Sequence, residues 1–175
     1  PLKHQLSAAA VKCVDNAMDI RSVNTLRWDG ISWWAASSDG PGMCMVANAF
    51  GYDFDNVLGI TGGGGTARSV AAAWSANGGK IKQIGGNRLL DEDGPWNLCN
   101  DEAKFTINFD EDGGDISVRY EKMEGDFDSR IEYLSKNADG RWLLCAQHLH
   151  SWANLWAPKY SEQLPSLSLL LTRLV

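Results

Sequence analysis

At residues 61–68 the sequence reads Thr61-Gly62-Gly63-Gly64-Gly65-Thr66-Ala67-Arg68. Residues 56–60 before it form a short apolar run typical of a buried strand, and residues 69–76 after it are rich in helix formers. A strand, a glycine turn and a helix in this order begin a dinucleotide-binding unit. Glycines let the backbone approach a pyrophosphate, and the helix N-terminus offers it N–H groups and a partial positive charge. The alternative is a flexible turn without a ligand, because a glycine run alone is a weak signal.

The second strand of this unit is predicted at residues 80–84, and it leads into Gly85-Gly86-Asn87-Arg88. In a dinucleotide-binding fold this point faces the ribose of the adenosine. An acidic side chain there would accept a hydrogen bond from the ribose 2′-hydroxyl, whereas an arginine would meet a 2′-phosphate. Arg88 therefore favours NADP as the cofactor.

The composition is that of a folded chain of modest size. Its 175 residues suffice for one medium domain or two small lobes, and 44% of them are apolar. Apolar runs stay shorter than the ~18 residues that a membrane span needs, and the first ten residues lack the apolar region of a signal peptide. The four cysteines include no Cys-x-x-Cys pair and stand in apolar surroundings, which favours reduced thiols in a cytoplasmic protein.

The net charge of −6 is unevenly spread along the chain. Residues 91–132 carry fourteen acidic and four basic side chains, whereas the remainder carries eight acidic and twelve basic ones. The acidic block is typical of a solvated face. Because the chain has no basic stripe, we do not expect it to bind nucleic acid. The mildly basic remainder holds the glycine turn and suits an anionic cofactor.

The other elements are predicted from hydrophobic periodicity and turn residues. We expect a helix at 5–17, strands at 22–28 and 31–36 joined by an Asp29-Gly30 turn, a loop at 37–42, a helix at 43–50, a hairpin of strands at 105–109 and 116–120, a helix at 142–156 and a final helix after Pro165.

The helix at 142–156 is predicted to be amphipathic. Its apolar stripe, which we expect in the core, comprises Trp142, Cys145, Leu149, Trp152, Ala153 and Trp156. The opposite side carries Leu143, Gln147, His150 and Asn154. A mixed face of this kind is either solvent surface or the wall of a cleft.

Taken together, several motifs resemble those of shikimate dehydrogenases. They are Lys3 before a helix, Ser22-Val23-Asn24-Thr25-Leu26, Ser38-Asp39-Gly40, the glycine turn ending at Arg68, Asn87-Arg88, and Asn137-Ala138-Asp139-Gly140 followed by Ala146-Gln147. The resemblance covers about residues 1–90 and 129–175. It implies an α/β fold in which residues 51–136 form a Rossmann-like NADP-binding lobe. Residues 1–50 would form an incomplete α/β substrate-binding lobe, and C-terminal helices at 137–175 would return to that lobe.

The resemblance also implies a function, the NADP-dependent interconversion of 3-dehydroshikimate and shikimate in aromatic amino-acid biosynthesis. The small-molecule substrate would exchange a hydride with the nicotinamide and a proton with the protein. Lys3 and Asp39 match the catalytic pair of the family, and Asn24 and Gln147 match residues that bind the substrate hydroxyls. The cofactor-binding set is Gly62, Gly63, Gly64, Gly65, Thr66, Ala67, Asn87, Arg88 and Gly140. No metal site is expected.

The sequence also departs from the family pattern. Relative to typical members it is truncated before Lys3 and shortened after Arg88, and Leu89 stands where the family has threonine or serine. Two alternatives therefore stay open: a catalytically degenerate NADP-binding regulatory or interaction module, and a structural domain whose glycine run is only a loop. The sequence does not separate shikimate from quinate as the substrate, and it leaves the oligomeric state open.

Overall fold

The computed structural model describes the backbone of residues 3–175 and the side chains of residues 5–175. Its elements are, in chain order, α1 (Lys3–Ala9), β1 (Lys12–Cys13), β2 (Thr25–Trp28), β3 (Trp33–Ala36), α2 (Asp39–Ala49), β4 (Val57–Thr61), α3 (Gly65–Ala76), β5 (Lys80–Gly85), β6 (Phe105–Asn108), α4 (Phe127–Lys136), α5 (Gly140–Ser151), the π-helical segment η1 (Trp152–Trp156), the 3-10 segment η2 (Pro158–Gln163) and α6 (Leu167–Leu171).

The glycine turn lies at one end of a parallel sheet with the strand order β5-β4-β6. In β4, Leu58 pairs with Ile81 of β5 on one side and with Phe105 of β6 on the other. Leu58, Ile60 and Ile107 are fully buried in this sheet, as expected where helices cover parallel strands. The predicted α/β class with a parallel sheet is therefore confirmed, and the strand–turn–helix order is observed as β4, residues 62–64 and α3.

The predicted hairpin of residues 105–109 and 116–120 is wrong. Phe105–Asn108 forms β6, which runs parallel to β4. Ile116 pairs with Ile107 in a parallel bridge, and with Ala138 in another. Each bridge continues the sheet by one residue pair. The alternating pattern of residues 105–109 and 116–120 is compatible with either strand direction, because it shows only which side chains share a face. Asp115 closes the intervening loop, because its carboxylate accepts hydrogen bonds from the backbone and side chain of Thr106.

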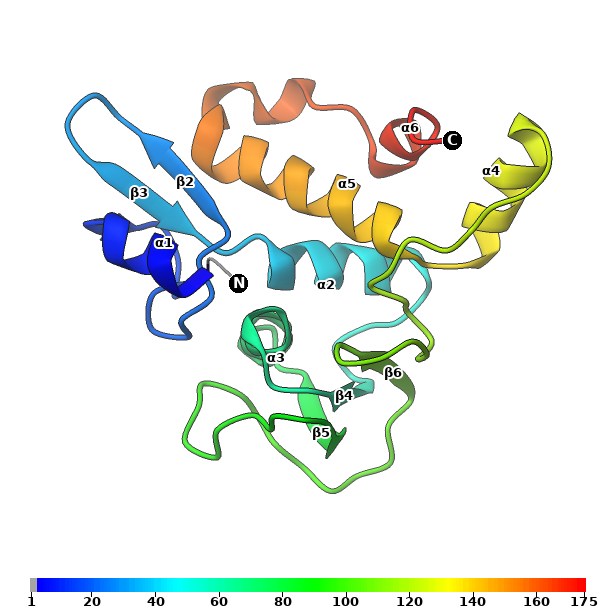
Figure 1. The fold of residues 1–175 in the computed structure, drawn as a ribbon, viewed down its shortest axis with the longest axis horizontal. Coiled ribbons are helices and arrows are strands. Elements are labelled where there is room, and N and C mark those ends of the chain that lie inside the picture. The colour runs from blue at the N-terminus through cyan, green and yellow to red at the C-terminus, as the bar shows by residue number, and fades with distance from the viewer. Residues whose placement is uncertain (1–2) are drawn as a thin grey trace.

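Three helices stack on one face of this sheet, and Figure 1 shows them in the order α3, α2 and α5 from the sheet outward. Two glycines of α2 permit the close packing. A Cβ on Gly40 would meet Ala73 of α3 at 2.7 Å, and a Cβ on Gly42 would lie 3.0 Å from the backbone nitrogen of Gln147 in α5. One apolar core runs through the sheet and all three helices, with Met43, Val70 and Ala146 fully buried.

Aromatic rings fill the end of the core where α3 meets the sheet. Trp74 has only 1% of its surface exposed, and its ring lies 5.3 Å from Phe105 and 4.8 Å from Phe54. Tyr52 stacks on the same Phe105 ring at 4.1 Å. The Trp74 indole also donates a hydrogen bond to the Asn56 carbonyl, which satisfies its polar atom.

A second, mixed sheet has the order β1-β3-β2. Strands β2 and β3 form the predicted hairpin, and Asp29 in its turn accepts hydrogen bonds from the N–H groups of Ile31 and Ser32. The predicted helix at 5–17 is too long, because α1 ends at Ala9 and Lys12–Cys13 pairs with β3 as a strand. The alanines favoured a helix locally, but hydrogen bonding to β3 decides the conformation of this segment.

Helix α2 begins earlier than predicted. The expected loop at 37–42 is in fact partly helical, since Asp39 is the first residue of α2 and Pro41 lies in its first turn. Proline is tolerated there because the N–H groups of the first turn have no partner within the helix. Among the described helices, none is long and apolar enough to cross a membrane.

Candidate functional site: a glycine-turn cleft beside a buried carboxylate

The glycine turn packs tightly against the turn that follows β5. Gly62 has a φ of +103° and donates its N–H to the Gly85 carbonyl at 2.8 Å. A side chain on Gly63 would collide with the Leu89 carbonyl. These two glycines are thus required by the protein's own chain packing, whatever binds nearby.

Gly64 is different, because a Cβ built on it would meet open space. It is the N-cap residue of α3, which puts it where the N–H groups of the first helical turn point outward. A cleft of about 280 Å³ opens in front of it, lined by Asp39, Gly64, Gly65, Thr66, Ala67, Phe109, Asp110, Val118, Leu143 and Gln147. A helix N-terminus at the wall of a cleft is a suitable place for a phosphate group.

A buried polar cluster forms another part of the cleft wall. Asp39 at the start of α2 has only 3% of its surface exposed. Its Oδ1 accepts a hydrogen bond of 2.7 Å from the side-chain amide of Asn24 and another of 2.7 Å from that of Gln147. The loop before β2, the start of α2 and the middle of α5 therefore bring three of the predicted site residues into contact.

A smaller cavity of about 130 Å³ adjoins the same cluster. It is lined by Asn24, Thr25, Ser38, Gln147, His148, Ser151 and Trp156. Gln147 lines both the glycine-turn cleft and this smaller cavity. Sequence reasoning missed most of its lining. Only Gln147 on the polar side of the predicted helix indicated that α5 faces a cleft.

The hydrogen bonds around this cavity hold its polar groups in place. The Asn24 carbonyl oxygen accepts from the Ser38 N–H at 2.9 Å, while its amide also donates to the Ser38 hydroxyl at 3.1 Å. The Thr25 hydroxyl donates to the Asn24 carbonyl oxygen and lies 3.4 Å from the Ser151 hydroxyl. The cluster is therefore pre-organised for binding a polar ligand.

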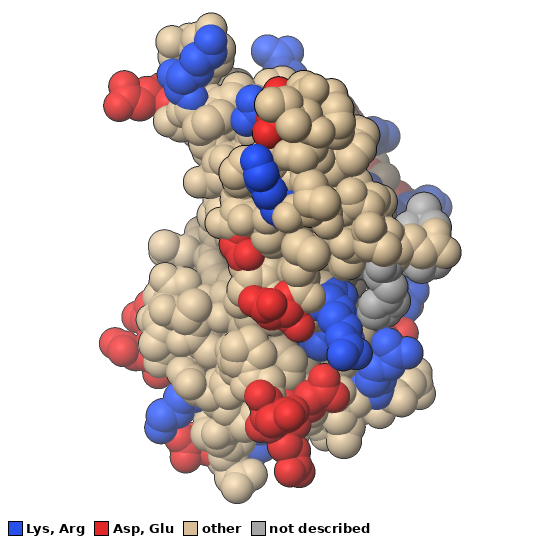
Figure 2. All heavy atoms as spheres, turned by 90° about the vertical axis from the view of Figure 1, so that its left-hand side faces the viewer, with Lys and Arg blue, Asp and Glu red and all other residues tan. Residues whose placement is uncertain are grey.

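Arg88 lies in a different cavity from the glycine-turn cleft. This cavity, of about 480 Å³, is lined by Asp19, Ile20, Arg21, Arg68, Arg88, Asp91, Asp93, Gly94, Pro95 and Trp96. On the face of the molecule shown in Figure 2, basic and acidic side chains lie next to one another. Arg21 adopts the left-handed backbone conformation at φ +52°, which is uncommon for a residue other than glycine.

Arg68 lines the same cavity as Arg88 but is bound to the protein's own backbone. Its guanidinium donates to the carbonyls of Ile20, Gly63 and Arg21, at 2.7, 3.0 and 3.0 Å. Burial lowers the pKa of Arg68, while the charge of Asp91 raises it. Arg68 thus fixes the glycine turn against the loop at residues 20–21, and three of its five N–H donors are used within the protein.

Three other predicted site residues are Lys3, Asn87 and Gly140. The side chain of Lys3 lies outside the described residues. The Asn87 N–H donates to Asp110 at 2.6 Å. Gly140 is absent from the lining of the glycine-turn cleft; its N–H donates to the Arg119 carbonyl at 2.7 Å, and a Cβ there would meet that carbonyl at 3.0 Å. Among the described residues, no cluster of His, Cys, Asp and Glu could hold a metal ion.

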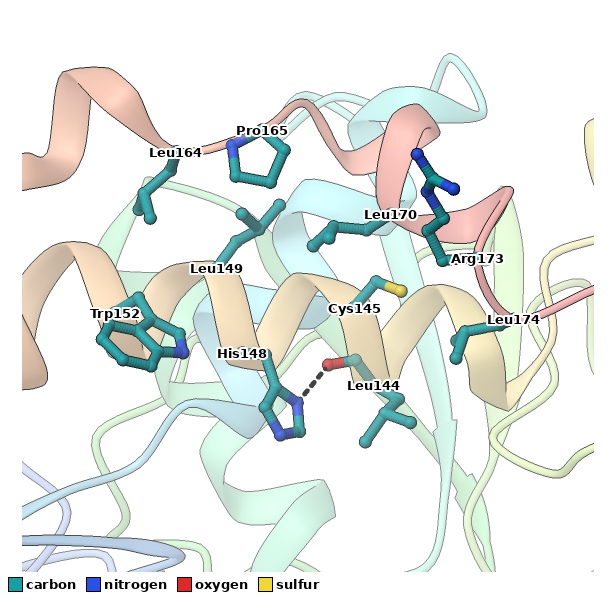
Figure 3. Close-up of a pocket in the computed structure, with 10 residues that line it drawn as sticks. All are labelled: Leu144, Cys145, His148, Leu149, Trp152, Leu164, Pro165, Leu170, Arg173 and Leu174. Carbon is teal, nitrogen blue, oxygen red and sulfur yellow. Dashed lines mark hydrogen bonds between the residues drawn. The ribbon is translucent and has the colours of Figure 1, made fainter.

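The core stripe predicted for residues 142–156, which belong to α5 and η1, is only partly in the core. Cys145 and Leu149 are buried, but Trp152 is 46% exposed and Trp156 is 36% exposed. Cys145, Leu149 and Trp152 line an apolar groove of about 580 Å³ between α5 and the C-terminal segment (Figure 3). Leu143, which we expected on the polar side, is buried in the main core. The polar wall of the smaller cavity is instead made by Gln147, His148 and Ser151.

No protein-family model matches this sequence, and no curated protein is similar enough in sequence to be matched. The fold, in contrast, resembles solved shikimate dehydrogenases. The enzyme from Listeria monocytogenes, in complex with shikimate and NAD, superposes with a TM-score of 0.70 over 100% of this chain and 75% of its own, at 13% identity. The enzyme from Thermus thermophilus, in complex with NADP(H) and shikimate, gives 0.68 over 100% and 77%, at 18% identity.

The shikimate dehydrogenase of Aquifex aeolicus gives a TM-score of 0.67 over 99% of this chain and 74% of its own, at 16% identity. The chain therefore has the fold of shikimate dehydrogenases over nearly its whole described length, and it spans about three quarters of the length of these solved structures.

Proposed function

We propose that this protein is an NADP-dependent oxidoreductase that interconverts 3-dehydroshikimate and shikimate. One observation carries the proposal: the glycine-turn cleft and the Asn24–Asp39–Gln147 cluster share a wall, so a dinucleotide and a polyhydroxylated substrate would meet there. The solved structures of the same fold that contain shikimate together with NADP(H) or NAD support this assignment.

The cleft suits the phosphates of a dinucleotide at Gly64–Ala67, where the N-terminus of α3 faces open space. When bound, the nicotinamide would supply or take up the hydride. The adenosine half, which carries the 2′-phosphate of NADP, would extend toward Arg88, whose cavity is also lined by Arg21. Two arginines can match the 2′-phosphate of NADP by charge-assisted hydrogen bonds.

The protein's own side chains would bind and orient the substrate. Asn24 and Gln147 each present amide groups that are already positioned by the Asp39 carboxylate. A substrate hydroxyl bound there finds fixed partners, and an unsatisfied buried donor would cost about 1–3 kcal/mol. The proton of the reacting hydroxyl would be exchanged with Lys3, with Asp39 as its acidic partner. This role rests on the resemblance to the family.

Arg88→Ala is expected to reduce the preference for NADPH over NADH. Because the guanidinium would contact only the 2′-phosphate, affinity for NADPH should fall about tenfold or more, as expected for loss of a charge-assisted hydrogen bond, while affinity for NADH should change little. Equilibrium binding of both cofactors, followed by energy transfer from the tryptophans to the reduced nicotinamide, measures this ratio. Equal losses for both cofactors would contradict a contact with the 2′-phosphate.

The direct test of the function is the absorbance of the nicotinamide band on mixing the protein with shikimate and NADP. We expect reduction of NADP that Lys3→Ala abolishes. The exposed Lys122→Ala, which removes a lysine elsewhere on the chain, is the matched control and should leave the rate unchanged. Turnover that Lys3→Ala leaves unchanged would contradict the proposed mechanism. Dinucleotide binding without turnover would instead favour the degenerate NADP-binding module.

A further inference from the structure

Asp110 is an acidic residue placed at the glycine turn. It lies two residues beyond the end of β6, the strand next to β4, so parallel pairing brings it beside residues 62–64. Its Oδ1 would lie 2.9 Å from a Cβ built on Gly62, and its Oδ2 accepts the Asn87 N–H at 2.6 Å. Asp110 also lines the cleft in front of Gly64–Ala67.

No base neutralises this carboxylate directly within the described part of the chain. The nearby Arg119 donates to the Asp110 backbone carbonyl at 3.1 Å, and its guanidinium forms an ion pair of 2.7 Å with Asp112 instead. The carboxylate of Asp110 is therefore held between the turns after β4 and β5 by a backbone N–H, and Asp110 is one of the residues that line the cleft.

A pyrophosphate bound at the N-terminus of α3 would come close to this negative charge. Like charges that come close together in a surface cleft repel each other, and this repulsion opposes the attraction that a helix N-terminus provides. The repulsion is independent of the 2′-phosphate, which would lie toward the cavity of Arg21 and Arg88.

We propose that Asp110 lowers the affinity of the glycine turn for all pyrophosphate-bearing dinucleotides. The proposal rests on the proposed function, because it assumes that this turn receives the pyrophosphate of the cofactor. The Asp110 carboxylate thus competes with the pyrophosphate at the glycine turn. Dinucleotide affinity therefore depends more heavily on Arg21 and Arg88 in the other cavity.

Asp110→Asn tests this inference, because it removes the charge and keeps an oxygen that can accept the Asn87 N–H. Glu111→Gln is the matched control: it makes the same change of charge at the next residue, which is exposed and outside the cleft lining. Dissociation constants for NADPH and NADH are measured by tryptophan energy transfer. Asp110→Ser, which also offers an acceptor, provides a second neutral variant, and thermal unfolding shows whether each variant is folded.

We expect Asp110→Asn to bind both NADPH and NADH about tenfold more tightly at low salt, with the ratio between them unchanged. The gain should shrink at about 0.5 M KCl, because salt screens the repulsion, and Glu111→Gln should bind like the wild type. Unchanged or weaker binding by both neutral Asp110 variants would overturn the inference and leave the proposed function intact. If neither the wild type nor any variant binds either dinucleotide, the proposed function fails and this inference fails with it.

Discussion

Asp39→Asn is expected to lower kcat/KM for shikimate oxidation by about 100-fold or more, within the range usual for loss of a group that assists proton transfer. In the wild type a single oxygen of Asp39 accepts hydrogen bonds from the amides of Asn24 and Gln147. An asparagine has one amide oxygen and no charge, so it weakens both of these bonds and no longer supports a protonated lysine as its partner.

The measurement is steady-state kinetics with NADP, accompanied by a thermal unfolding curve for each variant. Asp53→Asn, the same chemical change at an exposed acid, is the control and should behave like the wild type. A folded Asp39→Asn protein with wild-type turnover would show that this carboxylate is only a structural acceptor for the two amides.

Gly40→Val is expected to destabilise the fold by about 3 kcal/mol or more, at the upper end of what overpacking costs. Helix α2 passes so close to α3 that a Cβ on Gly40 would collide with the Ser69 carbonyl. The Gly40 N–H also donates to the Ser69 hydroxyl at 2.8 Å, a hydrogen bond that would be lost if the two helices moved apart. Separation of the two helices would open the core and displace the adjacent Asp39.

Chemical denaturation of Gly40→Val compared with the wild type gives this difference in the free energy of unfolding. Gly64→Ala is the matched control, because its φ of −71° suits alanine and its Cβ would meet open space. We expect Gly64→Ala to change the free energy of unfolding by less than about 0.5 kcal/mol while weakening NADPH binding. A Gly40→Val protein as stable as the wild type would show that α2 and α3 can separate without cost.

Local sequence was sufficient for the elements whose signals are short-range. The apolar run before Thr61, the glycines and the alanine-rich run after them predicted β4, the turn and α3, and Asp29-Gly30 predicted the hairpin of β2 and β3. Local signals failed where a distant partner decides the conformation. Residues 12–13 follow an alanine-rich run that predicted a helix, but they pair with β3 as a strand. Ile116 pairs in parallel with Ile107 instead of closing a hairpin.

The candidate site shows the same division. Asn24 and Asp39 were selected from the sequence only through motifs that resemble a family, and Gln147 also through its place on the polar side of the predicted helix. The fold places Asn24 and Gln147 within hydrogen-bonding distance of Asp39. Asp110 was not selected, because a single acid in an acidic stretch is typical of a solvated loop. Its position at the glycine turn follows from the pairing of β6 with β4.

The amino-acid sequence by itself determined the glycine turn and its flanking strand and helix, because these depend on backbone conformation and local periodicity. The tertiary structure decided which glycines are required by chain packing, which one faces open space, and which charges surround it. Those properties arise from contacts between segments far apart in the sequence: Gly63 against Leu89, Arg68 against the loop at residues 20–21, and Asp110 beside Gly62. Such contacts exist only once the sheet and its helices have assembled.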